Sequence, residues 1–594
     1  MDRRDTNYYE AHAQTINLDK IASSGGNATI LQQLRDNDPN FTTLGIANSD
    51  NEYAVDDDDY LVDRGDDLGW LGYFVGQSNT LQSLYLSTKM IDNVIRFGVF
   101  IEGLNRNRSI ETLYICADLG SEYFRKMSDF FRSNNNLREL SFGSMDTIGV
   151  ESARSIAFML NQCKQSNLRK ICFEQSDASE EVLAEILTAI STHSQLEELN
   201  LGENNLGRDG SVALGEALQA CNNPRLQDLI LWNNSIDDEG LRALVAGMRN
   251  CHSLTDLHLY DNTLITVDGF RSLSTLFQSD CCQLKYLDLD SMNMGDDGAR
   301  VIAAGLAGLN SLEKLFLSDN AIGDDGARAL ATGLTNLQSL NMLRLSQNSI
   351  GDVGVQALVE GLVNCVNLKD LGLLGNRSIT ASGLRSLSTL LQSESCSLTE
   401  LSLWEIPFGD DGAIALVDAL KGNKSMEEMC FDPDSARVTS VGWSAFSKLL
   451  CDTSSVNATY LSNHYLTTIG TYDDEDAPEE VNQLLSSNKH PAEHVAIHKI
   501  LKSHPDFDME PFFEWKLKVL PIVVSWFGRV WNLADEHSWI SDESAEEIQS
   551  RQLSTMYNFV RGMPLLTIGG YHSRNNGASL AQTQTRKRNV DQLN

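Results

Sequence analysis

Residues 312–334 read LEKLFLSDNAIGDDGARALATGL and contain the pattern that decides the fold. Leucines stand at offsets 0, +3 and +5 (Leu312, Leu315 and Leu317), followed by Asn320 at +8 and an apolar residue at +10. The first part alternates apolar and polar residues, as a strand with one buried face does. After the Gly-Asp-Asp-Gly segment, apolar residues recur at helical spacing. The stretch therefore predicts a short strand, a turn and an amphipathic helix.

The same frame recurs along most of the chain. Clear copies start at Leu196, Leu226, Leu254, Leu340 and Leu368, and weaker ones at Phe41, Leu81, Ile110, Leu137, Leu168, Leu284, Leu398, Met426 and Val456. From Leu168 onward the starting positions recur at a nearly constant interval. A fixed period of this length is typical of a solenoid, in which one unit cannot bury its own apolar face and is stabilised by its neighbours.

A pair of acidic residues precedes several of the expected helices, as in Asp296-Asp297, Asp324-Asp325 and Asp410-Asp411. Paired carboxylates between glycines can hold a metal ion or carry out acid–base chemistry. A catalytic site is usually built once, however, whereas a helix start recurs in every repeat. We therefore interpret the pairs as residues that accept hydrogen bonds from free backbone N–H groups and complement the positive end of the helix dipole.

The repeat resembles the ribonuclease-inhibitor type of leucine-rich repeat. The residues that carry the resemblance follow the order L-x-x-L-x-L-x-x-N-x-I/L-G-D-D-G-A-x-x-L, and they cover about residues 81–466. This resemblance implies an α/β horseshoe with a parallel β-sheet on the concave face and helices on the convex face. Members of the family include inhibitors of ribonucleases, the sensor arms of NOD-like receptors and activators of the Ran GTPase. They share a fold without sharing one function.

Four segments follow from the position of the repeats. We expect a polar and acidic N-terminal segment with a decayed first repeat over residues 1–80, and about 14 repeats over residues 81–470. The acidic stretch 50–67 within the first segment is interpreted as a solvated loop. Residues 471–565 are expected to form a helical C-terminal cap, which covers the last open face of the solenoid. Residues 566–594 are polar and are expected to be disordered.

Composition restricts the classes of partner. The 594 residues contain 46 basic and 82 acidic side chains, a formal net charge of −36. Such a chain repels nucleic acid and anionic membranes, and it attracts basic proteins. MDRRDTNYYE does not follow the charged-then-apolar pattern of a secretory leader, so we expect a protein that is not secreted. No apolar run in the sequence approaches the length of a membrane helix. With eleven cysteines but no C-x-x-C pair, we expect reduced thiols in the cytoplasm, with the nucleus as the alternative. We also expect a monomer.

The sequence lacks the motifs of a nucleotide-binding motor, a zinc protease or a serine hydrolase. Gly422-Asn423-Lys424-Ser425 lacks the spacing of a phosphate-binding loop, and Gly442–Phe446 lacks the last glycine of a nucleophile elbow. His494 and His498 are four residues apart on an expected helix and can share a metal, but no third ligand is evident. We therefore predict a protein that is not an enzyme and that uses neither metal nor cofactor.

The concave face is the expected binding surface. Side chains of a strand alternate, so residues at offsets +2, +4 and +6 point away from the leucine core. These offsets combine aromatic and acidic side chains in the central repeats. The candidate partner-binding residues are Asp228, Trp232, Asp256, His258, Tyr260, Tyr286, Asp288, Asp290, Phe316 and Trp404. Aromatic anchors dominate protein–protein interfaces, and carboxylates pair with incoming Arg or Lys.

The function hypothesis is a non-catalytic scaffold or receptor that binds a basic protein or peptide on this face. The resemblance to Ran activators implies an alternative, activation of a small Ran-like GTPase, for which Arg208, Arg344 and Arg377 are candidate residues. A sensor of a foreign ligand is a third reading. A different explanation of the surface residues also remains open, because side chains at offsets +4 and +6 can simply pack against one another across strands.

Overall fold

The computed structural model describes residues 6–504 apart from residues 23, 49–58, 63–67, 88–93, 117–119, 144–149, 164–166, 175–179, 191, 222–224, 280–281 and 472–476. These residues belong to two compact units: residues 1–450 with 465–486, and residues 451–464 with 487–594. The tail expected to be disordered, residues 566–594, lies outside the described residues. The described helices are too short or too polar to cross a membrane.

Sixteen strands within the described residues of the first unit form one parallel sheet. They are β1 (Thr43–Asn48), β2 (Tyr60–Val62), β3 (Ser83–Ser87), β4 (Thr112–Cys116), β5 (Glu139–Gly143), β6 (Lys170–Glu174), β7 (Glu198–Asn200), β8 (Asp228–Ile230), β9 (Asp256–His258), β10 (Tyr286–Asp288), β11 (Lys314–Phe316), β12 (Met342–Arg344), β13 (Asp370–Gly372), β14 (Glu400–Ser402), β15 (Glu428–Cys430) and β16 (Thr468–Gly470). From β3 to β16 the strands lie side by side in sequence order, and at the other end β1 lies between β3 and the edge strand β2.

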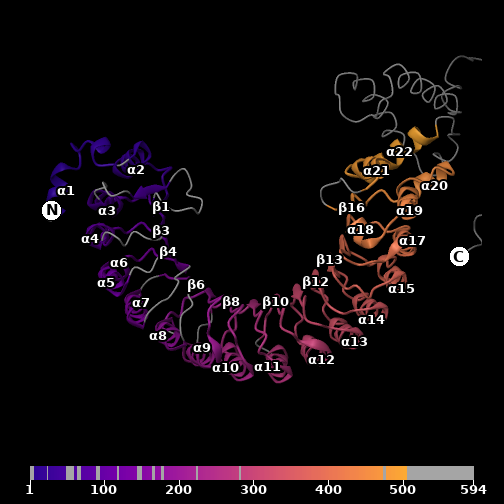
Figure 1. The fold of residues 1–594 in the computed structure, drawn as a ribbon, viewed down its shortest axis with the longest axis horizontal. Helices are drawn as coiled ribbons and strands as arrows, with labels where there is room; N and C mark the ends of the chain where they lie inside the picture. The colour runs from indigo at the N-terminus through magenta and orange to yellow at the C-terminus, as the bar shows by residue number, and fades with distance from the viewer. Residues whose placement is uncertain are drawn as a thin grey trace, which may run out of the picture. The chain divides into compact units, whose positions relative to one another are not determined.

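Helices follow the strands. They are α1 (Thr6–His12), the 3-10 helix η1 (Leu18–Lys20), α2 (Gly25–Asp36), α3 (Leu68–Gln77), α4 (Val94–Leu104), α5 (Gly120–Lys126), α6 (Ser128–Ser133), α7 (Val150–Gln162), α8 (Glu180–Ile190), α9 (Gly207–Cys221), α10 (Asp238–Met248), α11 (Val267–Phe277), α12 (Gly295–Leu306), α13 (Asp324–Leu334), α14 (Asp352–Leu362), α15 (Ala381–Ser386), α16 (Ser388–Leu391), α17 (Gly409–Leu420), α18 (Pro433–Ala436), α19 (Ser440–Leu450), α20 (Val456–Tyr460), α21 (Glu479–Asn488) and α22 (Ala492–Ser503). In the first unit the strands line the inner side of a curved array and the helices its outer side (Figure 1). The fold is thus the expected leucine-rich-repeat solenoid.

The leucine frame forms the core of the first unit. Leu257 pairs in register with Leu287, Leu287 with Leu315, and Leu315 with Leu343. All four side chains are fully buried. Folding moves each of these leucine side chains from water into a continuous apolar core, which stabilises the fold by about 1.5–3 kcal/mol per leucine. The prediction of a common spine is confirmed.

The repeated asparagine joins consecutive repeats. The amide of Asn320 donates to the backbone oxygen of Leu289 in the preceding repeat (2.7 Å). Its oxygen accepts the N–H groups of Met292 (3.0 Å) and Met294 (3.2 Å). Because the side chain is fully buried, these bonds satisfy backbone groups that water cannot reach.

The acidic pairs differ from expectation in which helix they serve. Asp296 accepts the N–H groups of Gly323 (2.7 Å) and Gly326 (2.9 Å), which begin the following helix α13. Asp324 does the same for Gly351 and Gly354, both at 2.8 Å, at the start of α14. The first aspartate of each pair therefore caps the helix of the next repeat. The helix starts of neighbouring repeats lie close enough for this hydrogen bond to form between repeats. The sequence of one repeat does not specify that contact.

Two other expectations are corrected. The copy expected at Val456 is wrong, since Val456–Tyr460 is helix α20 and the next strand, β16, lies beyond it, with Ile469 paired with Met429. The acidic stretch 50–67 is not entirely loop, because Tyr60–Val62 forms β2 at the edge of the sheet beside β1. Tyr60 is fully buried there. The segment boundaries at residues 80 and 470 remain predictions.

In the second unit, α20 and α22 pack together. Lys499 of α22 is buried and donates to the side-chain oxygen of Asn488 (2.7 Å). Burial lowers the pKa of Lys499 to about 7. Residues beyond 504, where the rest of the expected helical cap falls, lie outside the part of the chain that is described.

Candidate functional site

The side chains of the concave sheet face lie in rows that cross the strands. The first row holds the side chains at offset +2 of each repeat, the second those at offset +4 and the third those at offset +6. Strand register places Asp228, Asp256, Tyr286 and Lys314 side by side in the first row, and Ile230, His258, Asp288 and Phe316 in the second. Just past the strands, the N–H of Asn233 donates to the oxygen of Tyr260 (2.9 Å) and that of Asp261 to the oxygen of Asp290 (3.0 Å). These bonds continue the alignment into the third row.

Trp232 and Tyr260 form a stacked pair in the third row. Their ring centroids lie 5.2 Å apart and the rings are nearly parallel, at 3°. The indole leans over Gly202 in the preceding repeat, where an added Cβ would lie 2.1 Å from its Nε1 atom. The glycine therefore provides the space that the tryptophan ring occupies. Both rings remain partly exposed.

His258, Tyr286 and Phe316 form a second aromatic group beside the first. Tyr286 lies between the other two rings, 4.5 Å from His258 and 5.0 Å from Phe316 between centroids. The ammonium of Lys314 lies over the Tyr286 ring at 6.0 Å, within the range of a cation–π contact. The three rings span three neighbouring strands.

Asp228 is partly buried and lies close to other carboxylates. Burial, followed by the charges of Glu198 and Asp256, raises its pKa to about 7. Its Oδ1 atom is buried and has no hydrogen-bond donor among the described residues. His258 Nε2 lies 3.6 Å from that oxygen, but burial lowers the pKa of His258. The imidazole is therefore neutral near pH 7, and the contact is not an ion pair.

Asp288 and Asp290 form a second acidic position. Asp288 is only 8% exposed, so the expectation of an exposed side chain is wrong for it. Its Oδ1 atom accepts the N–H of Asp290 (3.1 Å), and burial raises its pKa. Burial, followed by the charge of Asp288, raises the pKa of Asp290 to about 7. A cation that arrived here would be attracted by both carboxylates and would lower both pKa values.

The structure gathers most, but not all, of the predicted site residues. Nine of them lie on or just after β8, β9, β10 and β11, whereas Trp404 follows β14 and is separated from the group by β12 and β13. The list omits Glu198, whose carboxylate contacts Lys170 Nζ at 2.9 Å in the same first row. It also omits Asp370. Lys170, Glu198 and Asp370 each stand at offset +2 of their repeat, so applying this offset to every repeat of the sequence identifies all three.

The arginines considered for GTPase activation are all engaged in ion pairs. Arg208 contacts Asp237 at 2.7 Å, and Arg377 contacts Glu405 at 2.6 Å. Arg344 pairs with Asp370 and lies 3.7 Å from Glu400. Each guanidinium is thus held by an acidic neighbour of the same chain, and no observation favours the activator hypothesis.

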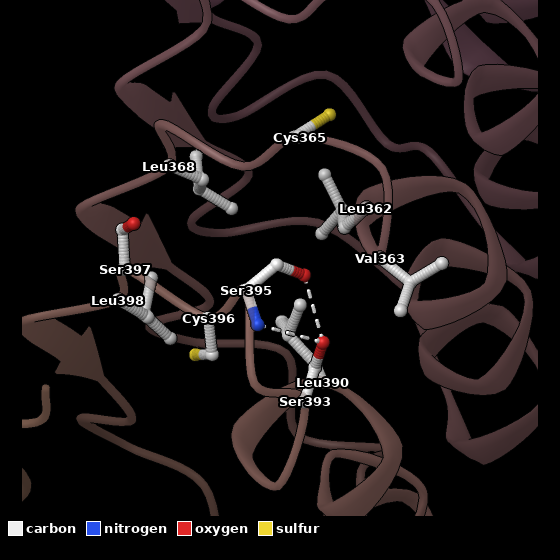
Figure 2. Close-up of a pocket in the computed structure, with 10 residues that line it drawn as sticks. All are labelled: Leu362, Val363, Cys365, Leu368, Leu390, Ser393, Ser395, Cys396, Ser397 and Leu398. Atoms are coloured by element: carbon white, nitrogen blue, oxygen red, sulfur yellow. Dashed lines mark hydrogen bonds between the residues drawn. The ribbon is translucent and has the colours of Figure 1, made fainter. Parts of the chain in front are cut away.

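A small hollow lies away from the concave face, where α14 and α16 end (Figure 2). Leu362, Leu368, Leu390 and Leu398 contribute to its apolar wall, and its volume is about that of one water molecule. Figure 2 also shows the Ser393 hydroxyl bonded to that of Ser395 (2.9 Å). The hollow is too small for a cofactor. No group of three or more potential metal ligands occurs within the described ranges, and the side chain of His494 falls outside them.

Known proteins resemble the chain in its repeats. The family model described as a leucine-rich repeat matches residues 222–245, 308–331 and 335–359. Mouse (Mus musculus) ribonuclease inhibitor is 29% identical over 248 residues, 41% of this chain and 53% of its own length. Mouse NACHT, LRR and PYD domains-containing protein 14 is 29% identical over 191 residues, 32% of this chain and 19% of its own length.

A third relative is the Protein phosphatase 1 regulatory subunit 37 homolog of Caenorhabditis briggsae, 30% identical over 135 residues, which are 23% of this chain and 14% of that protein. The matches to these relatives thus span between about one seventh and one half of the relatives' lengths. The recurring leucine frame, the parallel sheet and these matches lead to one conclusion: the chain is a leucine-rich repeat protein, related to ribonuclease inhibitor and to the leucine-rich repeat regions of the NACHT, LRR and PYD domains-containing proteins.

Proposed function

We propose that the chain is a non-catalytic scaffold or receptor that binds a basic protein or peptide on its concave face in the cytoplasm. The observation that carries this proposal is the combination of two aromatic groups with acidic side chains on β8 to β11. Aromatic side chains supply contact area at little cost in conformational entropy, and carboxylates make charge-assisted hydrogen bonds to Arg and Lys.

The electrostatic state of the acids supports a cationic partner. Asp228 and Asp290 each have a pKa of about 7, because burial and neighbouring carboxylates disfavour the charged form. A bound guanidinium removes part of that unfavourable energy, since an opposite charge at close range favours the carboxylate. The same surface would lose further energy if it bound an anion. The net charge of −36 adds a long-range attraction that speeds the encounter.

A binding measurement tests the proposal. Fluorescein-labelled nona-arginine is titrated with the full chain and with the variant Trp232→Ala/Tyr260→Ala, and its anisotropy is followed. We expect the dissociation constant to rise at least about tenfold, the effect typical of central aromatic anchors. Binding should also weaken as salt increases, because exposed charges are screened.

The matched control removes charge from the helix side. Asp297 and Asp325 are 76% and 69% exposed and pair only with Arg300 and Arg328 among the contacts of the described residues. Asp297→Asn/Asp325→Asn should leave peptide affinity nearly unchanged. If the aromatic variant and this control weaken binding equally, or neither does, attraction to the general negative charge explains the binding and the concave face is not the site.

A further inference from the structure

Charge in the first row of the concave face changes sign in blocks. Strand register places Glu198, Asp228 and Asp256 on consecutive strands, and we call these residues the first acidic triplet. Asp370, Glu400 and Glu428 occupy consecutive strands farther along and form the second acidic triplet. Between them the row continues through Tyr286, Lys314 and Met342, which include a cation and no acid.

Each triplet contains an oxygen that is buried without a hydrogen-bond donor among the described residues. These oxygens are Asp228 Oδ1 and Asp370 Oδ1. The side chain of Asp370 is only 8% exposed, and its other oxygen pairs with Arg344. A buried acceptor that lacks a donor destabilises the folded chain. A cation bound on the exposed side of each triplet would stabilise these carboxylates through space, because an opposite charge at close range favours the charged form.

Each triplet also retains excess negative charge. Lys170 contacts Glu198 at 2.9 Å in the first, and Arg344 contacts Asp370 and Glu400 in the second. One cation therefore faces three carboxylates at each end of the row. Lys314, in the middle, repels a third cation. Within the first row, the two ends attract cations and the centre at Tyr286 and Lys314 favours an apolar or neutral group, whereas Asp288 and Asp290 belong to the second and third rows.

The separation of the triplets is fixed by the sheet. Asp256 on β9 and Asp370 on β13 are four strand steps apart. At about 4.8 Å per step, their inner edges lie about 19 Å apart along the sheet. A partner segment that follows the first row must span this distance past the ammonium of Lys314, which disfavours a positive charge at that point of the row.

We propose, on the basis of the function proposed above, that the partner is a protein segment with two basic clusters separated by an uncharged spacer of about 19 Å, one cluster for each acidic triplet. The spacer corresponds to roughly six residues of extended chain or twelve of helix. Binding both clusters at once gives an avidity that neither cluster has alone.

Two synthetic peptides of identical composition test the proposal. In the split peptide, two arginine triplets flank six prolines, which form a stiff spacer of about 19 Å. In the contiguous peptide, six arginines lie together between two blocks of three prolines. We expect the full chain to bind the split peptide at least about tenfold more tightly in isothermal titration calorimetry at near-physiological salt.

Four variants identify the sites. Glu198→Gln/Asp228→Asn and Glu400→Gln/Glu428→Gln should each abolish the preference for the split peptide, whereas the outer pair Asp297→Asn/Asp325→Asn should retain it. Lys314→Glu, a single change on a partly exposed residue, should reduce the preference by strengthening binding of the contiguous peptide. This last variant keeps the test valid if either multiple substitution affects folding.

The outcomes separate the two proposals. Equal affinity for the two peptides, with both weakened by Trp232→Ala/Tyr260→Ala, would overturn the two-cluster proposal and leave the concave binding function in place. A preference that survives both triplet variants would also overturn it. Failure of both peptides to bind at low salt would overturn both proposals.

Discussion

Asp324 on the helix side and Asp228 on the sheet side belong to the same kind of repeat but meet opposite surroundings. Asp324 accepts two backbone N–H groups at 2.8 Å, whereas Asp228 keeps one oxygen buried without a donor among the described residues. Asp410, also on the helix side, has its pKa lowered, first by the Thr439 hydroxyl and then by the Thr439 N–H. Asp228 has its pKa raised to about 7 by burial and neighbouring carboxylates. The helix-side acids thus stabilise the repeat, while the sheet-side acids weaken it and leave a surface suited to a cation.

The largest expected effect tests the helix side. Asp324→Ala leaves the N–H groups of Gly351 and Gly354 without their acceptor and should lower the free energy of unfolding by about 2 kcal/mol. Urea unfolding followed by circular dichroism measures the change. Asp325→Ala is the matched control, because Asp325 is 69% exposed and its one ion-pair partner among the described residues is Arg328. This change should cost less than about 0.5 kcal/mol. Equal losses for the two variants would contradict the capping role.

The second prediction concerns the pH dependence of binding. Arginine stays charged throughout, so a bound arginine peptide should lower the pKa values of Asp228 and Asp290 and release about one proton. Affinity for nona-arginine should therefore rise about tenfold between pH 6 and pH 8 and level off above. The charged groups that act on the pKa of Asp228 are Glu198 and Asp256, which raise it, and Lys170, which lowers it.

Calorimetry in buffers of different ionisation enthalpy counts the released protons. In Asp228→Asn/Asp290→Asn the pH dependence should flatten while weaker binding persists. A slope that is unchanged in this variant would show that the titration lies elsewhere.

The third prediction is that removing a sheet-side carboxylate raises the free energy of unfolding, whereas removing the helix-side carboxylate of Asp324 lowers it. The folded pKa of Asp228, about 7, lies above the ordinary value of 3.8. The penalty is therefore absent below about pH 3.8, grows as pH rises toward 7 because only the unfolded chain then loses the proton, and is complete above pH 7. Asp228→Asn should therefore be more stable than the unaltered chain at pH 8, by less than about 1 kcal/mol because the group is partly exposed and screened. The gain should shrink toward pH 4. Destabilisation at pH 8 would mean that the carboxylate is satisfied in the folded chain.

The smallest effect tests the support of the aromatic pair. Gly202→Ala introduces a Cβ into the space of the Trp232 indole and should weaken peptide binding about threefold by displacing that ring. In the background of Trp232→Ala the same change should have no further effect, which a double-mutant cycle measures. Additive losses would show that Gly202 acts independently of the ring.

The sequence predicts the spine well and the inner face only in part. Leu315 and Leu343 recur at a fixed period, and each sits in the register that the period requires. The copy expected at Val456 fails because an insertion between the paired residues Met429 and Ile469 breaks the period. The burial of Asp288 depends on how neighbouring aromatic rings lean, which side-chain alternation does not specify. The binding role of the concave residues stays a prediction.

Asp238, Asp296, Asp324, Asp352 and Asp410 each accept backbone N–H groups at the start of the helix in the following repeat, so these five caps run in one direction along the chain. A chain shortened from its N-terminal side would therefore leave its first remaining helix without an acceptor for two backbone groups, whereas a chain shortened from the other side would strip no helix of its cap. We therefore expect fraying, proteolytic trimming and the evolutionary loss of whole repeats to destabilise the remaining chain more when they start from the N-terminal side than when they start from the other side.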